Sequence, residues 1–324
     1  MKIRIATRKS PLALAQTRWV GERIRAHRPD VEIEEVQLVT EGDRVLDKPL
    51  AKVGGKGLFV SEVEAALAEG RAEIAVHSMK DVPEKLAEGM TLAAIPERED
   101  PRDVIVTPHG GDLFSLEAGA RVGTSSLRRA VQLHRVRNDL AFTVLRGNVG
   151  TRLRKLDEGE VHAAVLALAG LKRLGLDRDR KLEVIPIEQS IPAVGQGALG
   201  IETREDAAEV RALLAPLEHD ATRIAVECER AFLARLHGSC TTPLAAHARF
   251  VEGRFRLDAM VGAIDGSRVL VTSDDVVLDA RNAVTAARAL GASAADRLLS
   301  EGAAEIVESA KKAADPYAGL YASR

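Results

Sequence analysis

The chain has little cysteine, little aromatic surface and no long uncharged hydrophobic run. Only two of its 324 residues are cysteines, Cys228 and Cys240, so no disulfide framework is expected and a reducing compartment is favoured. Aromatic residues make up 3% of the chain, which leaves few platforms for stacking nucleic-acid bases. No run approaches the roughly 18 uncharged apolar residues that a membrane helix needs. With a net charge of -2, neither nucleic acid nor a membrane is expected as a partner.

The remaining composition is that of an ordinary globular protein. Hydrophobic residues account for 46% of the chain and charged residues for 29%, and this length favours two or three domains. The first eight residues carry charges where the apolar core of a signal peptide would lie, so a cytoplasmic location is expected.

Short apolar strands alternate with helical patterns through the first two thirds of the chain. The predicted strands are 3–6, 31–39, 74–76, 92–95, 104–106, 142–145 and 163–168. Ser10 has the chemistry of an N-cap before a helix that starts at Pro11, and Ser61 to Glu64 form a capping-box pattern. Further helices are predicted to begin at Leu127 and Arg152. This alternation predicts α/β domains with parallel, doubly wound sheets.

The pattern changes near residue 218. A helix is predicted at 221–236, followed by two strands that meet across Glu252-Gly253, a third strand at 269–271 and an alanine-rich helical region. We therefore expect a first domain of residues 1–98 with 197–216, a second of 99–196 and a small α+β third of 217–324. The segment 96–101 would connect the first two domains, and the glycine-rich segment 191–200 would carry the chain back. Gly195, Gly197 and Gly200 spell G-x-G-x-x-G, but Pro192 and the lack of a following helix argue against a dinucleotide site.

A polar loop follows the buried strand at 74–76. Lys80 and Asp81 lie just beyond the carboxyl end of this strand, where open α/β sheets place their ligand sites. A solvated pair of loop charges is the alternative interpretation.

Positive charge is concentrated between residues 121 and 155. This window contains eight arginines and Lys155 against a single acid, Asp139, on a chain that is slightly acidic overall. Such a local excess steers anions, and arginine suits bidentate binding of carboxylate or phosphate. We expect Arg121, Arg135, Arg137 and Arg154 to be solvated and the arginines at turns and helix starts to bind a polyanion. Nucleic acid is disfavoured because Phe142 is the sole aromatic residue in the window.

The two cysteines differ in their surroundings. Cys228 shares helical spacing with apolar residues and is predicted to be a core residue. Cys240 follows Gly238 and Ser239 in a loop, where it is free to react, and His237 could favour its thiolate form. An inert loop cysteine and a cysteine hydrolase both remain open from these residues alone.

A glycine- and lysine-rich loop is predicted at 40–57. A loop of this length is either a functional lid or a segment without fixed structure.

Taken together, several motifs identify a family. Arg4 to Ala13, His77-Ser78-Met79-Lys80-Asp81-Val82-Pro83, Val122 to Arg129, Arg146-Gly147-Asn148-Val149-Gly150-Thr151-Arg152 and Gly195 to Glu202 closely resemble porphobilinogen deaminase (hydroxymethylbilane synthase). The resemblance covers nearly the whole chain, and this order of motifs is highly specific.

The resemblance implies two periplasmic-binding-protein-like domains and a third domain that carries a dipyrromethane cofactor on a thioether to Cys240. It implies that four porphobilinogen molecules are added head to tail with loss of ammonia, and that water then releases linear hydroxymethylbilane for tetrapyrrole and haem biosynthesis. Each pyrrole carries an acetate and a propionate, so an arginine-lined cleft fits the growing chain. A carboxylate would stabilise the cationic stages of the reaction.

Motif positions assign roles under this resemblance. Asp81 would be the catalytic carboxylate and Lys56 part of a mobile loop. The residues that would bind cofactor and substrate acids are Arg8, Ser10, Ser78, Lys80, Thr124, Ser126, Arg128, Arg129, Arg146, Arg152 and Arg173. No metal is implied. Two positions depart from the family: Ser239 replaces a usual glycine before the cysteine, and Thr203 stands where many members have a cysteine.

Two other functions remain as alternatives, a binding protein for polycarboxylates without catalysis and a cysteine-dependent hydrolase. The expected enzyme is a monomer that passes its product to a downstream enzyme of the tetrapyrrole pathway.

Overall fold

The chain forms two compact units in the computed structural model, which describes residues 1–39, 60–178, 180–238, 242–313, 315, 317, 320 and 321. Unit 1 comprises Met1–Glu99 and Gly197–Arg223, and unit 2 comprises Asp100–Gln196 and Ile224–Arg324. The chain changes units inside the predicted connection at 96–101 and returns inside the glycine-rich segment at 191–200. Residues of the predicted second and third domains share unit 2, and the division into three domains stays a prediction.

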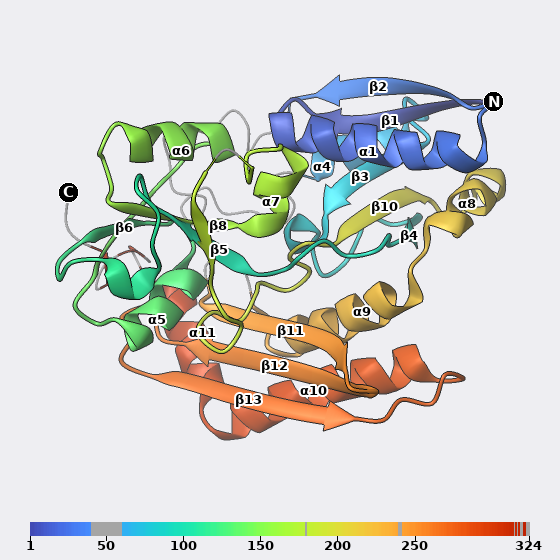
Figure 1. Ribbon diagram of the computed structural model, residues 1–324. Helices are drawn as coiled ribbons and strands as arrows, with labels where there is room; N and C mark the ends of the chain where they lie inside the picture. Colours follow the sequence, from blue (N-terminus) through green and yellow to red (C-terminus); the bar gives the residue numbers. More distant parts are fainter. Residues whose placement is uncertain are drawn as a thin grey trace. The chain divides into compact units, whose positions relative to one another are not determined.

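Unit 1 is built on a five-stranded sheet in the order β2-β1-β3-β10-β4 (Figure 1). Its strands are β1 (Lys2–Arg8), β2 (Glu32–Leu38), β3 (Ile74–Ser78), β4 (Met90–Ala94) and β10 (Leu199–Arg204). Its helices are α1 (Pro11–His27), α4 (Ser61–Ala68), α8 (Ala208–Leu214) and the 3-10 turns η1 (Met79–Asp81) and η3 (Ala215–Leu217). β1 runs parallel to β2 and β3, whereas β10 runs antiparallel to β3 and β4.

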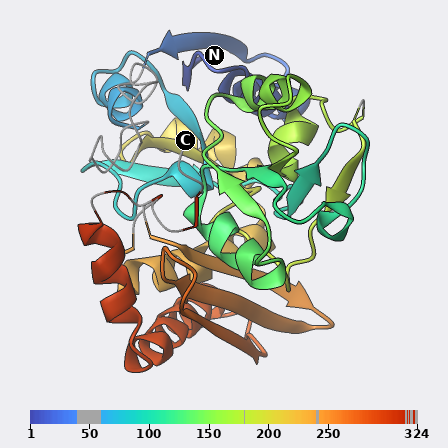
Figure 2. The ribbon, with the colours of Figure 1, turned by 90° about the vertical axis from the view of Figure 1, so that its left-hand side faces the viewer.

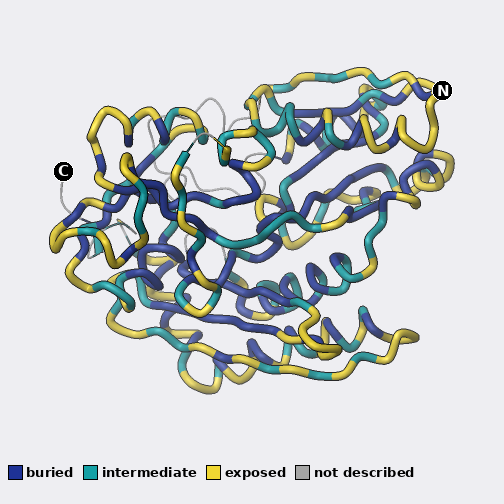
Figure 3. The backbone as a smooth tube through the Cα atoms, viewed as in Figure 1, coloured by how far each residue is buried: buried dark blue, intermediate teal, exposed yellow. Residues whose placement is uncertain are grey.

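Helices cover both faces of this sheet, because successive side chains of a strand point to opposite faces. Ile5 packs in the cluster that includes Ile24 of α1 and Leu213 of α8, and its neighbour Ala6 packs in the cluster that includes Leu67 of α4. Figure 3 shows the central strands buried and the outer helix turns exposed.

Unit 2 contains a second five-stranded sheet in the order β7-β6-β8-β5-β9. Its strands are β5 (Asp103–Val106), β6 (Arg121–Gly123), β7 (Ala141–Thr143), β8 (Ala163–Ala167) and β9 (Leu182–Val184). Its helices are η2 (Leu113–Ser115), α5 (Leu127–Val136), α6 (Val149–Asp157) and α7 (Leu168–Arg173). Ile105 packs with Leu133 of α5, and its neighbour Val106 packs with Leu153 of α6, so both faces are again covered.

Both sheets are mixed, which corrects the expectation of parallel sheets. β6 is parallel to β7 and β8, but β5 is antiparallel to β8 and β9. In each sheet the fourth strand in the order is antiparallel to its neighbours, and it is the first strand that the chain forms after changing units. A strand that arrives from another unit needs no helical crossover, so it is free of the geometry that keeps β-α-β strands parallel.

The predicted helix and strand positions are largely confirmed, with two corrections. Val60, not Ser61, is the N-cap of α4, and Ser61 is already its first helical residue, so the predicted capping box does not form. Helix α6 starts at Val149 rather than Arg152, because Asn148 caps it by accepting a hydrogen bond from the Thr151 amide at 2.9 Å.

Unit 2 also contains the predicted α+β region. Helix α9 (Asp220–Arg235) begins in the part of the chain that closes unit 1, and it is followed by the antiparallel sheet β11 (Leu244–Val251), β12 (Arg254–Gly262) and β13 (Val269–Val276). Glu252 and Gly253 join β11 and β12 with φ angles of 49° and 80°, the signs that a type I′ hairpin turn requires. Helices α10 (Ala283–Ser300) and α11 (Ala303–Lys312) pack on β12 and β13 (Figure 2). None of the helices in the described part of the chain is both long and apolar enough to cross a membrane.

Candidate active site

The loop after β3 holds two exposed charges on a buried anchor. Met79 is fully buried and its amide donates to the Ala198 carbonyl at 3.0 Å, which ties η1 to the segment before β10. Gly200 allows this approach, since a Cβ there would lie 2.4 Å from the Met79 sulfur. Lys80 and Asp81, which follow Met79 in this turn, are both exposed. The loop therefore presents an ammonium and a carboxylate from a fixed base.

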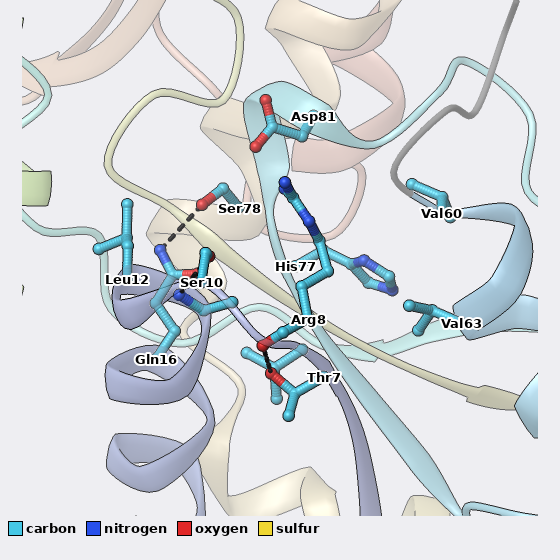
Figure 4. A pocket seen from close by; sticks show the side chains of 12 residues that line it. Thr7, Arg8, Ser10, Leu12, Gln16, Val60, Val63, His77, Ser78 and Asp81 are labelled. Carbon is cyan, nitrogen blue, oxygen red and sulfur yellow. Dashed lines mark hydrogen bonds between the residues drawn. The ribbon is translucent and has the colours of Figure 1, made fainter. Parts of the chain in front are cut away.

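Four of the predicted site residues line one pocket in unit 1 (Figure 4). These residues are Arg8, Ser10, Ser78 and Asp81. The Gln16 amide of α1 donates to the Ser78 hydroxyl at 2.8 Å and so fixes the end of β3 against α1. Figure 4 shows the Arg8 guanidinium extending from the end of β1 toward the Asp81 carboxylate. Ser10 caps α1, its hydroxyl accepting from the Ala13 amide at 3.3 Å.

A buried pair that the sequence did not predict lies beside this pocket. His77 Nε2 is 2.7 Å from Glu202 Oε2, and both side chains are almost completely buried. His77 lines the pocket, whereas Glu202 comes from β10. Both residues belong to motifs identified in the sequence. They are 125 residues apart, however, and no sequence pattern indicates that they are in contact.

In unit 2, Arg128 and Arg129 share a buried carboxylate. Asp103 Oδ2 lies 2.8 Å from Arg128, and Asp103 Oδ1 accepts from Arg129 at 2.8 and 3.0 Å. Ser190 and Gln196 each donate to Asp103 at 2.8 Å. Burial raises the pKa of Asp103, but the charges of Arg128 and Arg129 overcome this and hold it far below its usual range. Their role as ligand-binding residues stays a prediction, and the structure gives both an internal partner.

Arg146 lies in the loop between β7 and α6, and Arg152 lies in the first turn of α6. The Arg152 Nε donates to the Gly147 carbonyl at 2.8 Å across the first turn of α6. Burial, and then the like charges of Arg129 and Arg146, lower the pKa of Arg152 to about 10. The guanidiniums of Arg129 in α5 and Arg146 in the β7–α6 loop therefore repel that of Arg152 in α6.

The remaining predicted residues in unit 2 surround the ends of β6 and β8. Thr124 is buried, and its hydroxyl accepts from the Ser126 amide at 3.1 Å in the turn before α5. Ser126 is the N-cap residue of α5, and Arg173 is the last residue of α7. β6 and β8 are parallel neighbours, so the turns that follow them lie at the same end of the sheet, at the carboxyl ends of the strands.

Cys240 and Lys56 lie outside the described residues, as does the predicted loop at 42–57. Cys228 is described and is fully buried in the core with Phe232, as predicted. Burial raises the pKa of its thiol, which keeps it protonated and unreactive.

The G-x-G-x-x-G letters do not form a dinucleotide site. Gly200 lies inside strand β10 rather than at the start of a helix, and the preceding residues 191–196 are not a strand. The motif needs a strand before its glycines and a helix after them.

The fold and these sites together define a class of protein. Two mixed five-stranded sheets of the same order, with polar and cationic loops at their strand ends, and a small α+β region in unit 2 make an α/β protein equipped to hold an anionic ligand.

Several solute-binding proteins of known structure match part of this chain. They include the periplasmic aliphatic sulphonate binding protein SsuA from Escherichia coli (13% identity, 73% of this chain and 75% of that chain, TM-score 0.39). A periplasmic binding protein with high arginine specificity from Salmonella typhimurium matches at 10% identity over 68% of this chain and 93% of that chain, with a TM-score of 0.39.

The family is shown by sequence models instead. Residues 3–212 match porphobilinogen deaminase, dipyrromethane cofactor binding domain, and residues 223–300 match porphobilinogen deaminase, C-terminal domain. The chain therefore belongs to the porphobilinogen deaminase family. It is a transferase with a dipyrromethane cofactor and with hydroxymethylbilane synthase activity on porphobilinogen, in porphyrin biosynthesis. This membership decides against the non-catalytic binding protein and the cysteine hydrolase.

Proposed function

We propose that this enzyme divides its work between an acidic loop in unit 1 and an arginine cluster in unit 2. Asp81 would stabilise positive charge as it develops and move protons. Arg129, Arg146 and Arg152 would bind the carboxylates of the growing pyrrole chain, with Arg8, Lys80, Arg128 and Arg173 adding further positive charge. Cys240 would hold the cofactor through a thioether.

The crowding of Arg129, Arg146 and Arg152 is the observation that carries this proposal. Like charges repel, and the lowered pKa of Arg152 shows that its charge is destabilised where it lies. Asp103 offsets part of the positive charge of Arg128 and Arg129 but is a single carboxylate. A ligand with several carboxylates would relieve the repulsion. Acetate and propionate groups of linked pyrroles have this chemistry, so the residues present fit dipyrromethane.

The dipyrromethane, when bound, would supply the pyrrole carbon to which the first porphobilinogen is joined, and each later porphobilinogen would join the free end of the growing chain. The chain's own residues then have three tasks. The arginines hold carboxylates by charge-assisted hydrogen bonds, each contributing about 1.5–3 kcal/mol. Asp81 supplies a fixed negative charge near a bound ring, and it can accept or return a proton. The anchored Met79 keeps that carboxylate in place, which limits the reorganisation needed during the reaction.

The thioether is proposed on Cys240 because Cys228 is a poor candidate. Cys228 is buried in an apolar core and its thiol has a raised pKa, so it lacks both access and thiolate character. Intact-protein mass spectrometry tests this assignment. The wild-type chain should be heavier than its sequence by one dipyrromethane, and Cys240→Ser should lose that mass. Cys228→Ser is the matched control and should keep it. Loss of the extra mass in the control alone would transfer the attachment to Cys228.

The role of Asp81 is tested by Asp81→Asn, which keeps the shape of the side chain and removes its charge. We expect turnover to fall about 10²–10⁴-fold while the cofactor mass is retained. Glu88→Gln removes an exposed charge from the loop that follows and should leave turnover unchanged. Near-normal turnover in Asp81→Asn would remove this carboxylate from the mechanism.

We further propose that the enzyme acts in the cytoplasm as a monomer and delivers its product to a later enzyme of tetrapyrrole biosynthesis. Light scattering of the purified holoenzyme measures the oligomeric state, and a dimer mass would contradict this proposal.

A further inference from the structure

Three described residues near the end of the chain, Tyr317, Leu320 and Tyr321, pack on the edge of the second five-stranded sheet. Tyr321 forms a parallel bridge with Phe142 of β7, which is the edge strand, and its ring lies 6.3 Å from the Phe142 ring. The Tyr321 and Tyr317 rings meet edge to face at 5.0 Å. Leu320 packs in the same apolar cluster as Phe142. Three described side chains thus fix this segment against β7.

This packing places the Tyr317 hydroxyl between two loops of the predicted site. The hydroxyl donates to the Ser125 carbonyl, in the turn between β6 and α5, at 3.2 Å. Arg146, in the loop between β7 and α6, forms a side-chain hydrogen bond with the same hydroxyl. β6 and β7 are parallel neighbours, so both loops follow carboxyl ends of strands that lie at the same end of the sheet. The phenol therefore connects Arg146 to the turn that contains Thr124 and Ser126.

We propose that Tyr317 is a positioning residue that holds Arg146 in the orientation in which it binds a carboxylate of the pyrrole chain. This inference rests on the proposed function of Arg146 as a carboxylate-binding residue. Tyr317 belongs to a segment in which the sequence offered no motif.

A neutral anchor suits an arginine in this position. Arg146 and Arg152 carry like charges and repel each other. This repulsion would move the two guanidiniums apart unless another group held Arg146 in place. A carboxylate anchor would hold Arg146 but would also neutralise it and compete with the ligand, as Asp103 does for Arg128 and Arg129. A phenol has one donor and accepts through its oxygen. The Ser125 carbonyl takes the donor, so the oxygen is available to accept from Arg146 without neutralising the guanidinium.

The phenol stays neutral under ordinary conditions. Burial raises the pKa of Tyr317 above its usual value, and this outweighs the charge and hydrogen bond of Arg146 and the charge of Arg152, which lower it. The contact is therefore a hydrogen bond between a cation and a neutral group.

Steady-state kinetics of the holoenzyme with Tyr317→Phe test the proposal. The substitution keeps the ring that packs on Tyr321 and removes only the hydroxyl. We expect the KM for porphobilinogen to rise about three- to tenfold with kcat little changed, the effect of losing one hydrogen bond that orients a binding group.

Tyr321→Phe is the matched control. Its hydroxyl is buried and has no hydrogen-bond partner among the described residues, so KM should not change. If the segment mattered only for stability, neither variant would change KM, and the proposal would be wrong.

A double-mutant cycle with Arg146→Ala separates the two levels of inference. Arg146→Ala should raise KM, and adding Tyr317→Phe should then have no further effect, because Tyr317 acts through Arg146. An equal additional rise in the double variant would overturn the positioning role. If Arg146→Ala impairs binding and Tyr317→Phe does not, the positioning role also fails while the proposed function stands. If Arg146→Ala leaves KM unchanged, the assigned role of Arg146 in the proposed function fails as well.

Discussion

The two five-stranded sheets have the same strand order, and each places a buried carboxylate on its antiparallel strand. Glu202 lies on β10 in unit 1 and Asp103 on β5 in unit 2, and both are fully buried. Glu202 is paired with the imidazole of His77, a residue of the neighbouring strand. Asp103 is paired with the guanidiniums of Arg128 and Arg129, which come from helix α5. The antiparallel strand of each sheet therefore carries a buried carboxylate, but with a different charge partner and at a different register: Glu202 lies opposite Ala75 near the start of β3, and Asp103 lies opposite Ala167 at the end of β8.

The difference shows how one architecture can support two chemical tasks. A guanidinium is always charged, so the Asp103 cluster carries a permanent positive excess next to the other arginines. The His77–Glu202 pair sets one imidazole against one carboxylate, so it lacks the second cation that gives the Asp103 cluster its positive excess. Unit 2 is thus suited to hold anions, whereas unit 1 leaves the exposed Asp81 as a negative group.

The segments after the third strand of each sheet show the same contrast. β3 leads into η1, which ends at Asp81, whereas β8 leads directly into α7, which ends with Lys172 and Arg173. Equivalent strands therefore deliver a lysine and an aspartate in one unit and two cations in the other.

The largest effect on stability is expected from Asp103→Asn. Two buried guanidiniums would lose their carboxylate, and breaking a buried ion pair costs about 3–5 kcal/mol. Urea denaturation measures the change in the free energy of unfolding. Asp139→Asn is the control, because Asp139 pairs with Arg137 near the surface and its loss should change the free energy of unfolding far less. Similar costs for both variants would show that the buried cluster is not a special source of stability.

Acid should weaken the same cluster. The folded pKa of Asp103 is depressed, so its contribution is present above the unfolded value of about 3.9 and is lost as the pH falls toward the folded value. We expect the urea midpoint of the wild type to fall as the pH is lowered from about 5 to 3. In Asp103→Asn part of this slope should be missing. Identical slopes in the two proteins would contradict the depressed pKa.

Sequence patterns predicted most of the fold because helices and strands depend on local periodicity. The strand at 74–76, the N-cap Ser10 and the hairpin at Glu252-Gly253 are all confirmed. The capping box at Ser61 was wrong by one residue, since the chain enters α4 at Val60. The antiparallel strands were missed because the direction of a strand depends on the connection that precedes it. The periodicity of apolar residues carries no information about that connection.

The buried partners in the site could not be predicted in the same way. Arg128 and Arg129 follow a turn and look like anion-binding residues, but Asp103, 26 residues before Arg129, lies next to them in the fold. His77 meets Glu202 only because β10 returns beside β3. These contacts depend on sheet order, and so does the meeting of Tyr317 with Ser125, 192 residues apart.

A smaller effect is expected from Glu202→Gln, which sharpens the comparison with Asp103. The Glu202 Oε1 atom has no hydrogen-bond partner among the described residues, so an amide group there would include a buried polar atom without a partner. We expect the free energy of unfolding to fall by about 1–3 kcal/mol, less than for Asp103→Asn. The same urea experiment compares the two. A loss equal to that of Asp103→Asn would mean that the two buried carboxylates contribute equally to stability.

The smallest effect compares the first helix of each sheet. Ser10 caps α1 with its side chain, whereas the described contacts of Ser126 include no such bond at the start of α5. Ser10→Ala should lower the free energy of unfolding by about 1 kcal/mol, and Ser126→Ala should change it by only a few tenths. Because both residues are also predicted to assist ligand binding, the measurement is made on stability by urea denaturation. If Ser126→Ala proves as costly as Ser10→Ala, its hydroxyl has a structural role that the helix start does not show. If both variants are as stable as the wild type, neither serine stabilises its helix through its side chain. The contrast between the two units would then be confined to their charges.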